Sequence, residues 1–370
     1  MNRVYLDHNA TTPLRPEARE AMQHAMDVVG NPSSVHAEGR AAKAIVEKAR
    51  GQVAALVGVE TSEVVFCGSA TEAAAQVLAM PWARVFWTGV EHDCIAAHVS
   101  DHWYDLPLEK DGVRQTMPME SLPFASGDLL VVQLANSETG VTQDDFATMT
   151  EAAHSGALAL IDTVQMCGKS GCDFGASPRK GFHLMSAHKI GGPKGVAALI
   201  VPTGTNVTAM ISGGGQEMGR RSGTENVIGI AGFGAAAQAA QRDVEAGRWD
   251  RVEKLRNILE NALAAASKTT IFVGKEAPRL PNTSCFITPG WKGETQVMQM
   301  DLAGFAISAG SACSSGKVKA SRVLKAMGYS GLEAASAVRV SLGLDTTEDE
   351  VLRFAEAWTQ KLKKHEARAA

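Results

Sequence analysis

Residues 158–162 read Leu-Ala-Leu-Ile-Asp, a run whose first four residues would make both faces of a strand apolar. Such runs are typical of strands buried between two layers of helices. Similar runs predict further strands at 64–66, 84–88, 129–134, 184–187 and 196–201. Helical patterns alternate with them, at 38–57, 71–80 and 146–155. The alternation predicts an α/β fold with a largely parallel sheet, in which ligands bind at the carboxyl ends of the strands.

The last third of the chain has a different pattern. Apolar residues recur at helical spacing over 252–263. Short strands are predicted at 270–273 and 284–287. A final helix begins with the capping box Thr347 to Glu350, and its polar tail after Lys361 is expected to fray. These patterns predict a smaller α+β domain, which agrees with two domains for 370 residues at roughly 150 residues per domain.

Composition and charge exclude several classes of protein. Hydrophobic residues make up 45% and charged residues 21% of the chain, which is ordinary for a globular protein but not for a disordered or fibrous one. The 36 basic and 40 acidic residues leave no basic excess to bind nucleic acid. The longest apolar runs, 129–132 and 196–201, are far shorter than the roughly 18 residues of a membrane helix. Asp7 stands where a signal peptide needs an apolar core, so we expect a soluble, cytoplasmic protein without membrane partners.

Six cysteines are scattered along the chain without a Cys-x-x-Cys pair, which predicts neither a disulfide framework nor a structural zinc site. Most are expected to be buried as small hydrophobic side chains. Cys313 differs, because it stands in the Gly, Ser and Ala-rich run 307–316. A thiol in such a loop is exposed and is a candidate reactive thiol, although the local signature of a cysteine protease is missing.

Polar clusters stand at the ends of predicted strands. One cluster is Ser186-Ala187-His188-Lys189, which is followed by Gly191-Gly192-Pro193. It suits an anionic ligand and a nucleophilic amine, but it could also be a polar turn with one surface lysine. Gly68-Ser69-Ala70-Thr71-Glu72 opens a predicted helix and is either a phosphate seat or a plain helix cap. Asp162 follows a predicted strand, where it would either bind a protonated ring nitrogen or a metal ion, or cap a helix. The glycine-rich segment 213–226 is either a phosphate loop or a surface connection.

In this combination and order, the segments resemble the cysteine desulfurases, within the class V aminotransferase group of pyridoxal-phosphate enzymes. The resemblance runs essentially end to end. It is carried by Tyr5-Leu6-Asp7-His8-Asn9-Ala10-Thr11-Thr12-Pro13, Gly30-Asn31-Pro32-Ser33-Ser34-Val35-His36, Ser69-Ala70-Thr71-Glu72, Glu91-His92, Ser186-Ala187-His188-Lys189, Arg220-Arg221-Ser222-Gly223-Thr224-Glu225, Leu280-Pro281-Asn282-Thr283 and the Cys313 loop. That loop is similar to the loop of the first subgroup, which supplies sulfur to iron–sulfur or nitrogenase cofactor assembly. Departures such as Cys67-Gly68, Cys94 and Met218 remove no catalytic group.

The resemblance implies a fold-type I enzyme with pyridoxal 5'-phosphate as cofactor and L-cysteine as substrate. Residues 15–245 would form the large cofactor-binding domain. Residues 1–14 with 246–370 would form the small domain that carries the Cys313 loop. A homodimer is implied, together with a sulfur-acceptor or iron–sulfur scaffold protein as partner. The resemblance leaves open whether Cys313 ligates a transient iron–sulfur cluster.

The resemblance also implies catalytic roles. Lys189 would hold the cofactor as a Schiff base and later move the substrate's α-proton. His92 would stack on the cofactor ring. The Cys313 thiolate would attack the substrate sulfur, which leaves a persulfide and releases alanine. Asn136 and Arg339 would bind the substrate carboxylate, the arginine through its planar fork.

Other residues would bind the cofactor. Asp162 would pair with the pyridinium nitrogen and Gln165 would hydrogen-bond the phenolic oxygen of the ring, near which Asn136 would also lie. The phosphate would be held by the backbone after Ala70, by the side chains of Thr71, Ser186 and His188, and by Thr224 of the other subunit.

Two classes of alternative remain. Another class V enzyme, such as a selenocysteine lyase or an aminotransferase, would share the fold, but the Cys313 loop favours a desulfurase because a transaminase needs no such thiol. A scaffold relative without activity would not need Lys189, Asp162 and Arg339, which this chain has.

Overall fold

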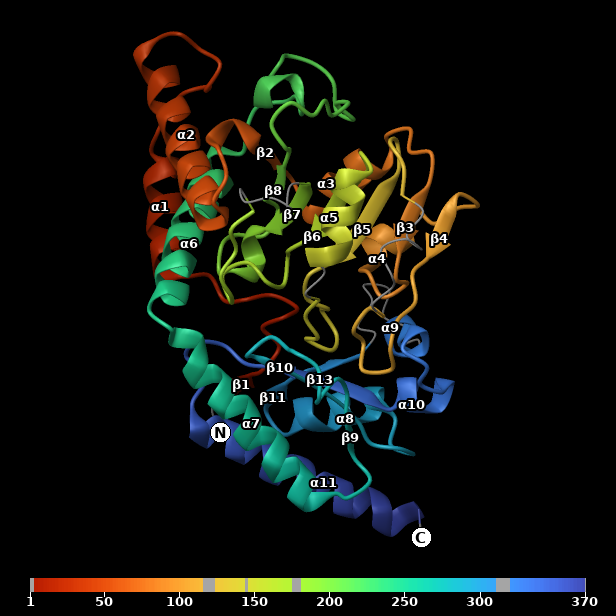
Figure 1. Ribbon diagram of the computed structural model, residues 1–370. Helices are drawn as coiled ribbons and strands as arrows, with labels where there is room; N and C mark the ends of the chain where they lie inside the picture. The colour runs from red at the N-terminus through yellow and green to blue at the C-terminus, as the bar shows by residue number, and fades with distance from the viewer. Residues whose placement is uncertain (1–2, 116–123, 144–145, 175–180, 311–319, 370) are drawn as a thin grey trace.

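The computed structural model describes residues 3–115, 124–143, 146–174, 181–310 and 320–369. Its larger sheet has seven strands in the order β2-β8-β7-β6-β5-β3-β4 (Figure 1). The strands are β2 (Val64–Cys67), β3 (Val85–Trp87), β4 (Trp103–Asp105), β5 (Leu129–Gln133), β6 (Leu158–Asp162), β7 (Phe182–Ser186) and β8 (Ala197–Ile200). Strand β8 runs antiparallel to both of its neighbours, β2 and β7, and the other neighbouring pairs of this sheet are parallel. The predicted α/β fold with a mostly parallel sheet is therefore confirmed.

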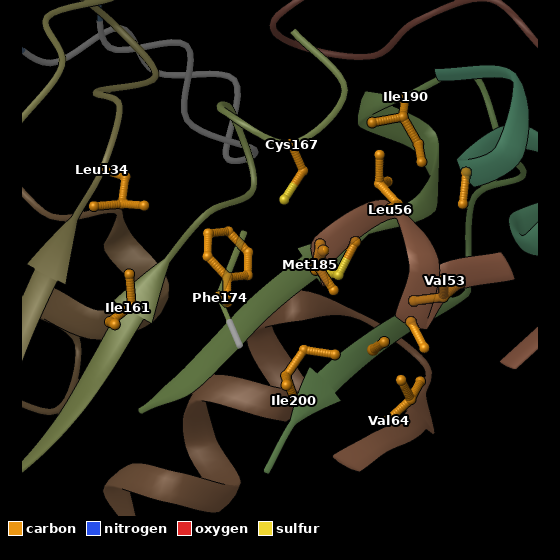
Figure 2. Close-up of a cluster of buried hydrophobic side chains, with 14 of the residues drawn as sticks. Val53, Leu56, Val64, Leu134, Ile161, Cys167, Phe174, Met185, Ile190 and Ile200 are labelled. Atoms are coloured by element: carbon orange, nitrogen blue, oxygen red, sulfur yellow. The ribbon is translucent and has the colours of Figure 1, made fainter. Parts of the chain in front are cut away.

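Helices cover both faces of this sheet. One face packs against α1 (Pro16–Met26), α2 (Ala37–Val57), α5 (Phe146–His154) and α6 (Val227–Glu245), and the other against α3 (Ala70–Leu78) and α4 (Asp93–Ala96). Strand β5 shows why residues 129–132 are all apolar, since Leu130 and Val132 enter the first core while Leu129 and Val131 enter the second. Figure 2 shows part of the first core, in which side chains of α2 gather with those of β2, β7 and β8.

Helix α6 is the main element of this part that the sequence patterns do not predict. It contains three glycines, Gly229, Gly232 and Gly234, which lower helix propensity. At Gly234 a Cβ atom would lie 2.5 Å from the Cα atom of Ala49 in α2. The glycine therefore permits the close packing of α2 on α6, and tertiary packing overrides the local propensity.

A second body of structure lies below the large sheet in Figure 1. Its strands form a four-stranded sheet, β12-β13-β10-β9, and a two-stranded sheet, β1-β11. They are β1 (Val4–Tyr5), β9 (Ile271–Phe272), β10 (Thr283–Ile287), β11 (Phe305–Ala306), β12 (Ser308–Ala309) and β13 (Ala337–Ser341). The helices are α7 (Arg248–Ala266), α8 (Gly293–Leu302), α9 (Arg322–Ala326), α10 (Gly331–Ala335) and α11 (Glu348–Ala369).

The second body has its own core. The predicted stripe on α7, which includes Val252, Leu259 and Leu263, packs with Phe354 and Trp358 of α11. The parallel pairing of β1 with β11 joins the start of the chain to this body. On this pairing we propose the division of the chain into 15–245 and 1–14 with 246–370.

The last helix corrects one expectation. Its capping box is present, with Thr347 N donating to Glu350 Oε2 (2.9 Å) and Glu350 N donating to Thr347 Oγ1 (3.3 Å). The predicted fraying after Lys361 is wrong, because α11 continues to residue 369. Leu362 is buried in the core, and the ring of His365 stacks on Trp291 with 5.4 Å between centroids, so packing holds the tail in the helix. No helix of the described ranges is long and apolar enough to span a membrane.

Candidate active site at the carboxyl ends of the strands

A cavity of about 480 Å³ lies where the parallel strands of the large sheet end. Gln133 ends β5, Asp162 ends β6 and Ser186 ends β7, and all three line the cavity. The turn between β2 and α3 closes another side with Gly68. The carboxyl ends of parallel strands meet at one edge of a sheet, which is why residues far apart in the sequence converge here.

Lys189 enters this cavity from a 3₁₀ turn, Ala187–Lys189, directly after β7. Its Nζ atom donates to the carbonyl oxygens of Asn9 (2.5 Å) and Ala10 (3.0 Å). Burial, together with the positive charge of Arg339, lowers the pKa of this amine to about 8, although the charges of Asp162 and Asp7 oppose the shift. The chain thus presents an amine with a substantial neutral fraction near neutral pH, which suits a nucleophile.

The start of α3 forms an anion seat beside the amine. Ser69 caps the helix, since its Oγ atom accepts from Glu72 N (3.1 Å). The next N–H groups, of Ala70 and Thr71, have no carbonyl of an earlier turn to bind, and both residues line the cavity. The two interpretations of this segment are therefore compatible, because Ser69 is the cap and the residues after it are available to an anion.

His188 and Ser186 line the same cavity. Burial lowers the pKa of His188 to about 4, with the charges of Lys189 and Lys194 acting in the same direction. The imidazole is therefore neutral at neutral pH and can offer a hydrogen bond but no charge. Its Nδ1 atom already bonds Thr11 Oγ1 (3.2 Å), which leaves Nε2 for a ligand.

Asp162 is a buried carboxyl with few partners. It is 5% exposed, and burial raises its pKa. Its Oδ1 atom accepts from Val164 N (3.0 Å), and Gln133 Nε2 lies 3.4 Å from Oδ2. Turns rather than a helix follow it, so it does not cap a helix. Within the described ranges no cation forms an ion pair with Asp162, and a positively charged ligand atom would stabilise its ionised form.

A second cavity of about 230 Å³ adjoins the first. The residues that line both are Ala10, His92, Ser137 and Lys189. Arg339 of β13 lines the second cavity; its Nη2 atom donates to Asp7 Oδ1 (2.7 Å) and its Nη1 atom to the Ser137 carbonyl (2.9 Å). Its Nε atom is buried and has no hydrogen-bond partner among the described residues. A carboxylate in this cavity would satisfy that donor.

His92 stands at the junction of the two cavities as the N-cap of α4. Its Nδ1 atom accepts from Cys94 N (3.1 Å), which assigns the ring proton to Nε2 in the neutral form. Arg322 of α9 donates to the carbonyl oxygens of Gly89 and Glu91, and so fixes the turn that precedes His92. The segment that carries His92 is thus held by elements from both bodies of the structure.

Comparison with known proteins places this geometry in a family. The sequence profile of aminotransferase class-V matches residues 4–354. The chain belongs to the class-V aminotransferase family. A cysteine desulfurase of Klebsiella pneumoniae is 37% identical over 95% of this chain and 90% of its own length, and one of Cereibacter sphaeroides is 38% identical over 96% and 95%. The solved structure of a NifS-like protein from Rickettsia africae superposes with a TM-score of 0.89 at 31% identity, covering 97% of this chain and 99% of that one.

In this member of the class-V aminotransferase family, the structure brings most of the predicted site residues together. The first cavity is lined by Ala70, Thr71, His92, Asp162, Gln165, Ser186, His188 and Lys189. Arg339 reaches only the adjoining cavity. Cys313 lies outside the described residues.

Asn136 and Thr224 lie elsewhere. Asn136 is not among the described residues that line either cavity, and its Nδ2 atom donates to the carbonyl of Val90 (3.0 Å) and to Gln133 Oε1 (2.9 Å). Thr224 is exposed and lines a separate cavity of about 160 Å³, which shares Gly68 with the first. The contacts predicted for these two residues stay predictions.

Several lining residues of the class-V site have no role assigned from the sequence. They are Thr11, Cys94, Gln133, Ser137 and Lys194. Gln133 ends β5, but it lies one residue inside the predicted strand 129–134, so the rule that found Asp162 would not have marked it. Lys194 is exposed and shares the cavity with Lys189, so the assignment of the reactive lysine needs a direct test.

Proposed function

We propose that this protein is a pyridoxal 5'-phosphate-dependent cysteine desulfurase, which converts L-cysteine to L-alanine and passes the sulfur to an acceptor. The observation that carries the proposal is the joined pair of cavities, in which Lys189 lies between an anion seat, the buried Asp162 and Arg339, whose Nε atom has no partner among the described residues. The names and end-to-end similarity of the relatives support the choice of reaction within the family.

The described residues fit the cofactor. A protonated pyridine nitrogen would supply the ion-pair partner that Asp162 does not find among the described residues. The start of α3 and the neutral His188 offer N–H groups to a phosphate. Gln165 would donate to the ring oxygen, and Lys189 would bind the aldehyde carbon covalently. When bound, pyridoxal phosphate supplies an electron sink that lowers the cost of breaking bonds at the substrate's α- and β-carbons.

The chain's own groups then act on cysteine. Arg339 would donate from its Nε atom to the substrate carboxylate, while its bond to Asp7 fixes the guanidinium. Lys189 would remove the α-proton and return a proton to carbon. Because Arg339 and Lys189 face the same second cavity, the carboxylate and the α-carbon of one small amino acid can be reached together.

Sulfur transfer completes the proposed reaction. The Cys313 thiolate attacks the substrate sulfur, a new S–S bond forms, and the C–S bond breaks with its electron pair moving to the β-carbon. Protonation of that carbon gives alanine, so cysteine and the enzyme thiol become alanine and an enzyme persulfide. No outside oxidant or reductant is needed.

The partners follow from the same proposal. Thr224 would reach the phosphate in the other subunit of a homodimer. A sulfur-acceptor or iron–sulfur scaffold protein would receive the persulfide sulfur from Cys313.

The test is alanine formation from cysteine alone. Purified protein with pyridoxal phosphate should release alanine without any keto acid, and reduction with borohydride should label Lys189. A strict requirement for a keto acid would identify an aminotransferase instead. Label on Lys194 with none on Lys189 would refute the assignment of the reactive amine.

A further inference from the structure

Lys169 is a buried amine with no part in the proposed reaction. Lys169 is only 4% exposed to solvent. Its Nζ atom donates to the carbonyl oxygen and to the Oε1 atom of Gln165, both at 2.9 Å. Burial, with the charges of Lys189 and Arg339 as further causes, lowers its pKa to about 7. Burying an amine costs free energy, which suggests that the contact of Lys169 with Gln165 has a function.

The turn that carries Lys169 is firmly held. Gly168, the residue before it, has φ +73°, and a Cβ atom there would lie 2.9 Å from side-chain atoms of both Ala240 and Ile190. The Gly168 carbonyl accepts from Trp249 Nε1 (2.7 Å). The fixed backbone of this turn therefore holds Lys169 next to Gln165, which lies four residues earlier in the chain.

The contacts of Gln165 define which way its amide faces. Its Nε2 atom donates to the carbonyl oxygen of Asn9 (3.0 Å), and a carbonyl can only accept. Lys169 donates to the other end, Oε1. A flipped amide would put Oε1 against the carbonyl of Asn9 and would lose both bonds. The Nε2 atom keeps a second N–H, and Gln165 lines the first cavity.

We infer that Lys169 is a positioning residue, which fixes the Gln165 amide so that an N–H and not an oxygen is presented to an anionic ligand atom in the cavity. This inference rests on the proposed function, in which that atom is the phenolic oxygen of pyridoxal phosphate. Without Lys169 the amide can turn, and Oε1 would then repel the phenolic oxygen.

A double-mutant cycle on cofactor binding tests the inference. Apoprotein is titrated with pyridoxal 5'-phosphate for K169M, Q165L and the double variant, with absorbance as the readout. A hydrogen bond to a charged group contributes enough that K169M and Q165L should each weaken binding by about tenfold. K169M should add nothing further in the Q165L background, because Lys169 acts through Gln165. A full additional loss in that background would overturn the inference.

Two further measurements keep the test decisive. The analogue 3-deoxypyridoxal 5'-phosphate has no phenolic oxygen, so K169M should bind it as well as the parent protein does. A selective loss confined to the natural cofactor supports the inference, whereas an equal loss with both compounds means that K169M has only loosened the site. K169Q stays polar but is too short for both acceptors, and it replaces K169M should the apolar variant fail to fold, with the same expected pattern.

A matched control separates failure of this inference from failure of the proposed function. Lys363 is an exposed lysine of α11 outside the cavities, and K363M should bind pyridoxal phosphate as the parent does. If the parent itself binds no pyridoxal phosphate, the proposed function fails. If the parent binds it and K169M behaves as K363M does, only the positioning role of Lys169 is refuted.

Discussion

Covalent capture of pyridoxal phosphate should follow the titration of Lys189. Only the neutral amine attacks an aldehyde carbon, and burial lowers the pKa of this lysine from 10.5 to about 8. At pH 7 about one tenth of such an amine is neutral, against about one in three thousand for an ordinary lysine. The shift therefore makes capture at pH 7 about 300-fold faster than it would be with an unperturbed lysine of equal reactivity.

The assay mixes apoprotein with pyridoxal phosphate between pH 6 and pH 10 and follows absorbance, with Nα-acetyllysine as the control for the titration of the aldehyde itself. The rate should rise with pH and reach half of its maximum near pH 8, since deprotonation is complete above that value. Arg339→Gln removes a cation that lowers the pKa of Lys189, so the profile should shift to higher pH. A half-maximum near pH 10.5, or a shift to lower pH in Arg339→Gln, would refute the reasoning.

Three further perturbations test other parts of the structure. Asp162→Asn keeps the shape of the side chain but cannot balance a pyridinium charge. Because a charged partner shifts a pKa by one to three units, alanine formation should fall about a hundredfold. Unchanged turnover would exclude the pairing. Mixed dimers of Thr224→Val and Lys189→Ala subunits should have more activity than either parent variant, and no gain over the parents would argue against a shared site. Glu217→Ala leaves Arg50 without the carboxylate that bonds its Nη1 (2.7 Å) and Nη2 (2.8 Å) atoms, so urea unfolding should show a loss of about 3–5 kcal/mol; a loss below about 1 kcal/mol would contradict a buried ion pair.

The large sheet and its site are predictable from the sequence because local patterns specify them. All six strands predicted for the large sheet are present, with bounds that differ by at most two residues, because strands buried on both faces are mostly apolar. A polar residue at the end of such a run then marks the ligand edge, which is how Asp162 and Lys189 are found.

Other features depend on partners that are distant in the sequence. Helix α6 contains glycines that argue against a helix, and only its close packing on α2 explains them. The end of α11 is helical because His365 stacks on Trp291, a residue more than seventy positions earlier. In the sequence nothing distinguishes Lys169 from other polar residues, and its burial against Gln165 is found only in the structure.

The most direct test of the proposed desulfurase concerns Cys313. The Cys313→Ser variant should still bind pyridoxal phosphate with the same absorbance band, because Lys189, Asp162 and Arg339 are unchanged. After cysteine is added, mass spectrometry of the parent protein should show one extra sulfur on Cys313 and alanine in solution, and the variant should give neither at a useful rate. If Cys313→Ser makes alanine from cysteine as fast as the parent does, the persulfide mechanism is wrong.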